Sequence, residues 1–289
     1  MGEAFIGSEA VRAGTVTRGE LRWRYQAIYP NVYVPRTTVA TLRTRTIGAW
    51  LWSHRRGVIT GRAAAALHGA KWVDDDVPIE ILWSNNYGPQ GILARRDRYA
   101  PDELTRFGTM YVANPARTAL DLGRRLFRDD AVAHLDALGA ATGVAHADIL
   151  DLTHRYAGTK GVKRCREAVE LADYGAQSPK ETWLRLLLID AGFPRPQTQI
   201  PVVDAYGEPF AYLDMGWRHR MIAVEYDGDE HRVDRTRYAW DVVRLRRILG
   251  AGWLHIKVIA EDRRADILDR VWAAWRLRER EAMAVERPA

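Results

Sequence analysis

The first seventy residues combine short amphipathic helical stretches with one segment of strand-like alternation. Thr17 and Glu20 have the spacing of a capping box, which predicts a helix over residues 19–24. Residues 27–35 alternate around Pro30-Asn31, which predicts a tight hairpin. The pattern also predicts two further helices, spanning about 38–54 behind Thr37 or Thr38 and 62–67 behind Thr60. A basic helix followed by a two-stranded ribbon is the order of a winged helix.

From Val77 onward the apolar pattern changes to short strands followed by helices. Strands are expected over 77–83, 91–99 and 109–113, and Pro115 begins a helical region that extends to about residue 170. We interpret residues 73–177 as an α+β middle domain after an N-terminal domain, 1–72.

The strongest helix start in the chain opens the last third. Ser178 is an expected N-cap, with Pro179 at the first helical position and Glu181 at the third. Strands are predicted over 198–203, 210–217, 219–226 and 253–259, with helices over 234–249 and 263–281. This order predicts a third domain, 178–289, with a mixed sheet flanked by helices. The expected fold class is therefore multidomain, α/β and α+β.

Composition and charge narrow the function classes. The 289 residues include one cysteine, Cys165, which excludes an intramolecular disulfide framework and a multi-cysteine zinc site. No apolar run reaches the roughly 20 residues of a membrane-spanning helix, and the N-terminus lacks signal-peptide features, so a cytoplasmic protein with no membrane partner is expected. Residues 1–72 hold 11 Lys and Arg against 3 Asp and Glu, a balance of +8 that favours a nucleic-acid partner.

Three carboxylates in the last domain carry the candidate chemistry. Glu225 and Asp227 point to the same side of one expected strand, and a hairpin through residues 218–220 brings Asp214 opposite them. Like charges that close need a proton or a cation between them, and Mg²⁺ binds through one or two carboxylates plus a substrate phosphate. We therefore expect a Mg²⁺ (or Mn²⁺) site that acts on a phosphodiester. Glu181 either adds a fourth carboxylate or serves as the capping partner of Ser178.

Residues 178–262 resemble the very short patch repair (Vsr) endonuclease type of domain in the PD-(D/E)XK restriction-endonuclease-like superfamily. The resemblance rests on Glu181, on Tyr-Leu-Asp214, on Val-Glu225-Tyr-Asp227-Gly with His231 just beyond, and on the segment from Trp240 to Trp253. It implies that Asp214 binds Mg²⁺, that Glu225 and Asp227 complete the metal site, and that His231 assists proton transfer. The superfamily's usual lysine is absent because position 227 is aspartate, and the Vsr zinc site is absent.

Other interpretations of these residues remain open. Glu225 and Asp227 could be a solvated acidic strand end, and His231 a surface histidine after a turn. Arg244 and Arg247 either neutralise phosphate or pair with Asp241. The tryptophans of this domain are interpreted as core residues rather than base-stacking platforms; they are Trp217, Trp240 and Trp253.

The N-terminal half is similar to AbiEi-type antitoxins of type IV toxin–antitoxin systems, which are winged-helix DNA-binding repressors. The similarity rests on Thr17-Arg-Gly-Glu-Leu, the hairpin sequence and the Ala63–Gly69 segment. The residues that we expect to contact DNA are Arg18, Arg22, Arg24 and Arg36.

Two functions follow from these features. In the first, the chain binds DNA and is a metal-dependent endonuclease, a hydrolase of phosphodiester bonds. In the second, it is a transcriptional regulator or antitoxin with a catalytically degenerate nuclease-like domain. A homodimer is compatible with a winged helix.

Overall fold

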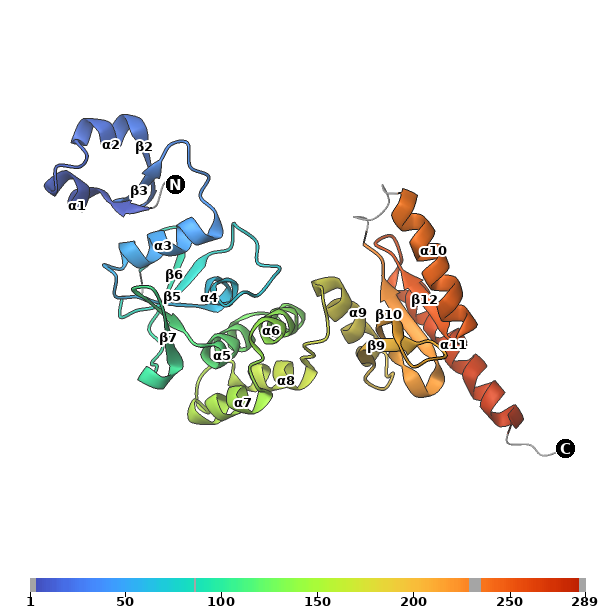
Figure 1. The fold of residues 1–289 in the computed structure, drawn as a ribbon. Helices are drawn as coiled ribbons and strands as arrows, with labels where there is room; N and C mark the ends of the chain where they lie inside the picture. Colours follow the sequence, from blue (N-terminus) through green and yellow to red (C-terminus); the bar gives the residue numbers. More distant parts are fainter. Residues whose placement is uncertain (1–3, 86, 229–234, 286–289) are drawn as a thin grey trace. The chain divides into compact units, whose positions relative to one another are not determined.

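The computed structural model describes residues 4–85, 87–228 and 235–285, and it divides the chain into two compact units, 1–174 and 175–289 (Figure 1). Within the described residues there are three β-sheets and eleven α-helices, so the predicted mixture of α and β structure is confirmed. The second unit begins within three residues of the predicted boundary at 178. The predicted boundary after residue 72 lies inside the first unit.

A three-stranded sheet with the order β1-β3-β2 begins the first unit. The elements here are β1 (Phe5–Ile6), α1 (Gly7–Arg12), α2 (Arg18–Arg24), β2 (Tyr25–Tyr29), β3 (Val32–Pro35) and α3 (Leu42–Trp52). The Thr17 capping box is present and the hairpin forms as predicted. Helix α3 begins later than the predicted start near residue 38, because Thr41 is its N-cap and the apolar Val39 is exposed and does not pack as part of the helix.

A five-stranded sheet with the order β6-β5-β4-β8-β7 follows. Its elements are β4 (Val58–Thr60), α4 (Gly61–Leu67), β5 (Ile79–Leu82), β6 (Ile92–Arg95), the 3₁₀ turn η1 (Pro101–Glu103), β7 (Leu104–Phe107) and β8 (Met110–Ala113). Strands β4 and β7 were not predicted. Strand β4 pairs with both β5 and β8, and one core includes Val34, Ile59 and Ile79. The segments before and after residue 72 therefore share a sheet and a core.

Four helices complete the first unit. They are α5 (Pro115–Arg125), α6 (Arg128–Thr142), α7 (His146–Arg155) and α8 (Val162–Leu171). The predicted start at Pro115 is confirmed, with Asn114 as the N-cap that accepts from the Arg117 amide. Gly143 ends α6 in the left-handed conformation, at φ 66°, which glycine adopts without strain.

The second unit contains the mixed sheet that the sequence predicts. Its order is β12-β11-β10-β9, with β11 and β12 parallel and the other pairs antiparallel. The elements are α9 (Pro179–Asp190), β9 (Gln197–Val203), β10 (Pro209–Trp217), the 3₁₀ turn η2 (Arg218–Arg220), β11 (Ile222–Tyr226), α10 (Arg235–Gly250), β12 (Leu254–Val258) and α11 (Arg264–Val285).

Helices cover both faces of this sheet, as predicted. Leu184 of α9 and Val271 of α11 pack with Val224 on one face. Ile248 of α10 packs with Leu213 and Ala223 on the other. The interpretation of Trp240 as a core residue was wrong, because its side chain is 72% exposed on α10.

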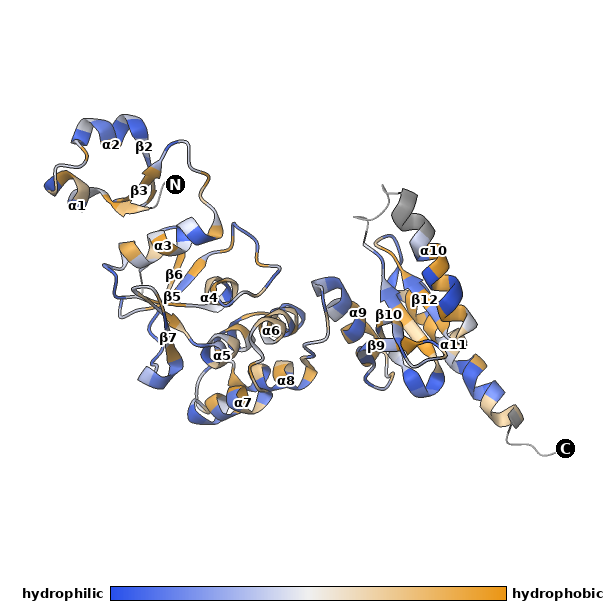
Figure 2. Cartoon of the chain, viewed as in Figure 1, coloured by the Kyte–Doolittle hydropathy of each residue, from blue (hydrophilic) through white to orange (hydrophobic). Residues whose placement is uncertain are grey.

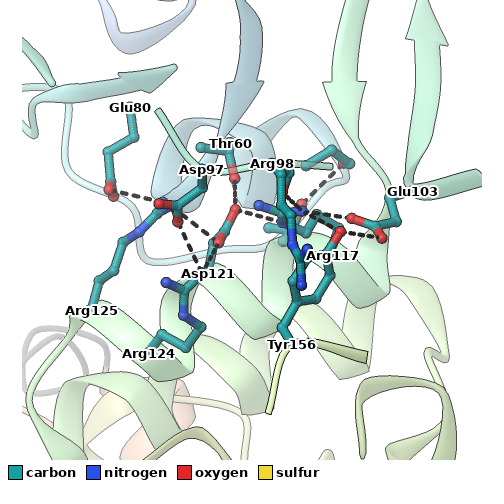
Figure 3. A network of polar contacts seen from close by, with 12 residues as sticks. Thr60, Glu80, Asp97, Arg98, Glu103, Arg117, Asp121, Arg124, Arg125 and Tyr156 are labelled. Carbon is teal, nitrogen blue, oxygen red and sulfur yellow. Dashed lines mark hydrogen bonds and ion pairs between the residues drawn. The ribbon is translucent and has the colours of Figure 1, made fainter. Parts of the chain in front are cut away.

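A buried network of ion pairs joins α5 to the five-stranded sheet of the first unit (Figure 3). Arg117 is fully buried; its Nε donates to Asp121 at 3.0 Å and its Nη1 to Glu103 at 2.5 Å. Asp121 also accepts from the Thr60 hydroxyl at 2.7 Å. Each buried charge has a charged partner, which is the condition under which a protein interior tolerates ions.

The Arg117→Met substitution should destabilise the first unit by about 3 kcal/mol, because it removes the fully buried cation that Glu103 and Asp121 share and leaves each carboxylate with only its less buried arginine partners, Arg155 for Glu103 and Arg124 and Arg125 for Asp121. Arg24→Met is the matched control, since Arg24 forms an exposed pair with Glu20. Hydrogen exchange of residues 115–125 during urea titration measures the effect. An unchanged midpoint for Arg117→Met would contradict a stabilising role of the network.

Candidate active site

Glu225 is the buried centre of a polar cluster at the end of β11. Its Oε1 accepts from Arg244 Nη2 at 2.7 Å, and its Oε2 lies 3.2 Å from Arg244 Nη1 and 2.5 Å from His255 Nε2. Burial alone would raise the pKa of Glu225, but the hydrogen bonds from His255 and Arg244 outweigh it and lower the pKa to about 2. Glu225 is therefore held as a carboxylate by residues from α10 and β12.

Asp214 lies beside Glu225 on the neighbouring strand. The antiparallel register pairs Met215 with Val224, which brings Asp214 level with Glu225, and the Tyr226 amide donates to Asp214 Oδ2 at 3.0 Å. Burial, together with the negative charges of Glu225 and Glu181, raises the pKa of Asp214 to about 7. The predicted convergence of positions 214 and 225 is thus present. Too little positive charge lies near Asp214 for it to ionise in the pH range in which an aspartate ordinarily does.

Glu181 takes part in the cap of α9 and in this cluster. Its Oε1 accepts from the Ser178 hydroxyl at 3.0 Å and its Oε2 from the Gln177 amide at 2.8 Å, so the predicted capping role is present. The side chain is also buried, and burial raises the pKa of Glu181. Both roles that the sequence allowed are therefore compatible with its position.

Asp227 has a different environment. Its Oδ2 lies 2.6 Å from Lys257 Nζ on β12, and its amide donates to the Val258 carbonyl at 2.8 Å.

Across residues 4–85, 87–228 and 235–285, no three His, Cys, Asp or Glu side chains are arranged to hold one metal ion. The fourth predicted catalytic residue, His231, lies outside the described residues.

The donor set nevertheless fits a hard divalent cation. Mg²⁺ takes oxygen ligands and commonly uses only one or two carboxylates, with substrate phosphate and water completing its coordination. Among the described residues, the Tyr226 amide is the one hydrogen-bond donor to the Asp214 carboxylate. Asp214, with Glu225 or Glu181 beside it, is the position where added positive charge would relieve the most repulsion.

Sequence reasoning missed two residues of β12: His255, which contacts Glu225, and Lys257, which forms an ion pair with Asp227. Their spacing of two residues places both on one face of a strand, but the sequence does not show that β12 lies parallel to β11. The pairing of Arg244 was also missed, because this residue contacts Glu225 across the sheet face, whereas the sequence suggested Asp241 as a partner.

The predicted DNA-contacting arginines lie together on the surface of the first unit. Arg18, Arg22 and Arg24 are exposed on α2, and exposed Arg36 follows β3 and donates to the Arg22 carbonyl at 2.9 Å. Figure 2 shows the hydrophilic character of α2 beside the apolar β3. The helix and the end of the ribbon thus form one basic surface.

Comparison with known proteins gives relatives of no assigned function. The chain is 29% identical over 163 residues to the uncharacterized proteins MT2308 and Rv2248 of two Mycobacterium tuberculosis strains, CDC 1551 / Oshkosh and H37Rv. The match covers 56% of this chain and 60% of each relative. No family model matches, and no solved structure matches.

Among the helices of the described residues, none combines the length and apolar character needed to cross a membrane.

The raised pKa of Asp214 predicts how an Asp214→Asn variant should unfold. In the folded chain Asp214 keeps its proton up to about pH 7, while in the unfolded chain it loses the proton near the ordinary aspartate pKa of about 3.9. The stability that protonated Asp214 contributes to the wild type is therefore fully present below about pH 4, and it is lost as the pH rises through about 7. The variant cannot ionise, so its free energy of unfolding should exceed that of the wild type by roughly 1–3 kcal/mol at pH 8, and by less at pH 5.

Urea unfolding at both pH values in the presence of EDTA measures this difference. Asp269→Asn is the matched control, because Asp269 is exposed on α11. A difference between Asp214→Asn and wild type that does not change between pH 5 and pH 8 would contradict the assigned pKa.

Proposed function

We propose that this protein binds DNA and that its second unit hydrolyses phosphodiester bonds with a divalent metal ion. The observation that carries the proposal is the position of Asp214, which lies half-buried beside the buried Glu225 and Glu181 and has its pKa raised to about 7. Buried carboxylates that repel one another are costly, and functional sites are where such perturbed groups gather. The resemblance of residues 178–262 to Vsr-type endonuclease domains supports the same chemistry and favours DNA as the substrate.

Each side chain has a role in this proposal. Asp214 and Glu225 hold the cation, and Glu181 adds negative charge from the start of α9. Arg244 and His255 keep Glu225 ionised and fixed in orientation through their hydrogen bonds. Mg²⁺ or Mn²⁺ at this position supplies Lewis-acid activation of the phosphate and of a bound water.

DNA binding is assigned to the first unit. The basic surface of α2 and Arg36 lies beside the β2–β3 ribbon, and the sequence resemblance of this half to AbiEi-type antitoxins supports a winged-helix role for it. Arginines that contact phosphate provide affinity that is independent of sequence, and this affinity falls steeply with salt.

One observation favours a second function, that of a transcriptional regulator or antitoxin. Arg244 and His255 engage both oxygens of Glu225, and Lys257 engages Asp227. A nuclease-like domain that has lost its metal could stabilise its carboxylates in this way. In that case the second unit would serve as an interaction module.

The two functions differ in plasmid cleavage. Wild-type protein with supercoiled plasmid and Mg²⁺ or Mn²⁺ should produce nicked or linear DNA, and Asp214→Asn should reduce the rate by at least about 100-fold, because it removes the central ligand. Asp269→Asn, which changes an exposed carboxylate of the same unit, should cleave as the wild type does. Equal cleavage by Asp214→Asn and wild type would identify a contaminant, and no cleavage by any of the three would favour the regulator.

DNA binding has its own test. The double variant Arg22→Ala/Arg24→Ala should bind a DNA duplex more weakly than wild type, and the slope of log affinity against log salt should fall by about 2, one for each lost phosphate contact. Gel-shift titration at several salt concentrations measures both quantities. Lys163→Ala on α8 is a control for the loss of an exposed cation. A salt slope unchanged by the double variant would remove α2 from the DNA interface.

A further inference from the structure

Lys257 is a lysine placed beside the carboxylate cluster by the neighbouring strand. In the parallel register of β11 and β12, Lys257 is the partner of Glu225, and its ammonium lies 2.6 Å from Asp227 Oδ2. His255, two residues earlier on β12, contacts Glu225. The alternation of side chains along a strand therefore puts Lys257 on the same sheet face as Glu225 and Asp227.

The other cations of this cluster are occupied. Arg244 donates through both Nη atoms to Glu225 and through Nη2 also to the Tyr212 carbonyl. His255 is buried against Glu225. Lys257 differs from both, because its side chain is 55% exposed and Asp227 is its one ionic partner among the described residues. An ammonium group has three donors, so this contact leaves two for a ligand from solvent.

A phosphodiester needs such a group here. Glu181, Asp214 and Glu225 give the cluster three carboxyl groups, Asp227 follows two residues after Glu225, and a nucleic-acid backbone would add further negative charge. A compact, mobile ammonium that reaches into solvent is a suitable phosphate donor. The choice of lysine is also notable in a chain with 38 arginines and 5 lysines, since arginine is its usual cation.

We propose that Lys257 is a phosphate-binding residue of the second unit, which contacts the DNA backbone through its exposed ammonium while Asp227 positions it. This inference rests on the proposed function, because it assigns to Lys257 the phosphate of the same substrate. If the contact with Asp227 were only a surface ion pair, its removal would change neither DNA contact nor cleavage.

Spectroscopy of the lysine side chains tests the contact without relying on cleavage. Full-length Asp214→Asn protein, labelled in lysine, is titrated in Mg²⁺ with a 12-base-pair duplex, and the Lys257 signal is assigned from a Lys257→Arg sample. The five lysines of the chain keep the spectrum simple. We expect the Lys257 ammonium signal to shift and saturate with bound DNA, while exposed Lys163 on α8 does not shift. A Lys257 signal that stays fixed when the protein is saturated with DNA would overturn the proposal.

Kinetics provide the second arm. Lys257→Ala should lower kcat/KM for plasmid cleavage by about 10- to 100-fold, and Lys257→Arg should recover most of it, because a guanidinium also binds phosphate. Arg263→Ala removes a cation from an exposed pair in the same unit and should leave cleavage unchanged. If wild type cleaves and Lys257→Ala cleaves equally, the inference about Lys257 fails while the nuclease function stands. If wild type does not cleave, the nuclease function fails, and the lysine titration still decides whether Lys257 contacts DNA.

Discussion

The carboxylate of Glu225 determines how the polar end of the second unit is built. Arg244 from α10 and His255 from β12 both bind it, so one buried charge links the helix on one sheet face to two parallel strands. Because these two cations are used on Glu225, the neighbouring Asp214 is left with the negative charges of Glu225 and Glu181 around it. Burial is the largest cause of the raised pKa of Asp214, and the negative charges of Glu225 and Glu181 add to it.

The buried network of the first unit shows the contrasting case. There Arg117 compensates Asp121 and Glu103, and Arg125 pairs with Asp97, Asp121 and Glu80. In such a network every buried carboxylate already has a cationic partner. It stabilises the packing of the helix on the sheet and has no uncompensated charge to bind a ligand. The cluster around Asp214 lacks that balance, and this difference is the reason for assigning function to one and architecture to the other.

Local sequence signals predicted the helices and strands, whereas the residues that meet at the candidate site depend on pairing between strands that are distant in the sequence. Thr17 with Glu20, and Ser178 with Pro179, mark helix starts that depend on a few neighbouring residues, and both are correct. Thr60 occupies the predicted N-cap position of α4, but its hydroxyl donates to Asp121, 61 residues away, instead of capping the helix, and the short strand that Thr60 ends was not predicted. Asp214 and Glu225 could be brought together from the sequence because a short hairpin joins their strands. His255 and Lys257 could not, because a parallel neighbour reached through a helix has no register that the sequence reveals.

The most direct test of the account is the location of a metal ion in crystals of the full chain grown with Mn²⁺. An anomalous difference map should show a peak within bonding distance of Asp214 and of Glu225 or Glu181, because Asp214 is the carboxylate that its negative neighbours destabilise and a cation there would relieve that repulsion. A map without a peak there, with Glu225 still held by Arg244 and His255, would contradict the assignment of a metal-dependent hydrolase and leave the regulator as the function of this chain.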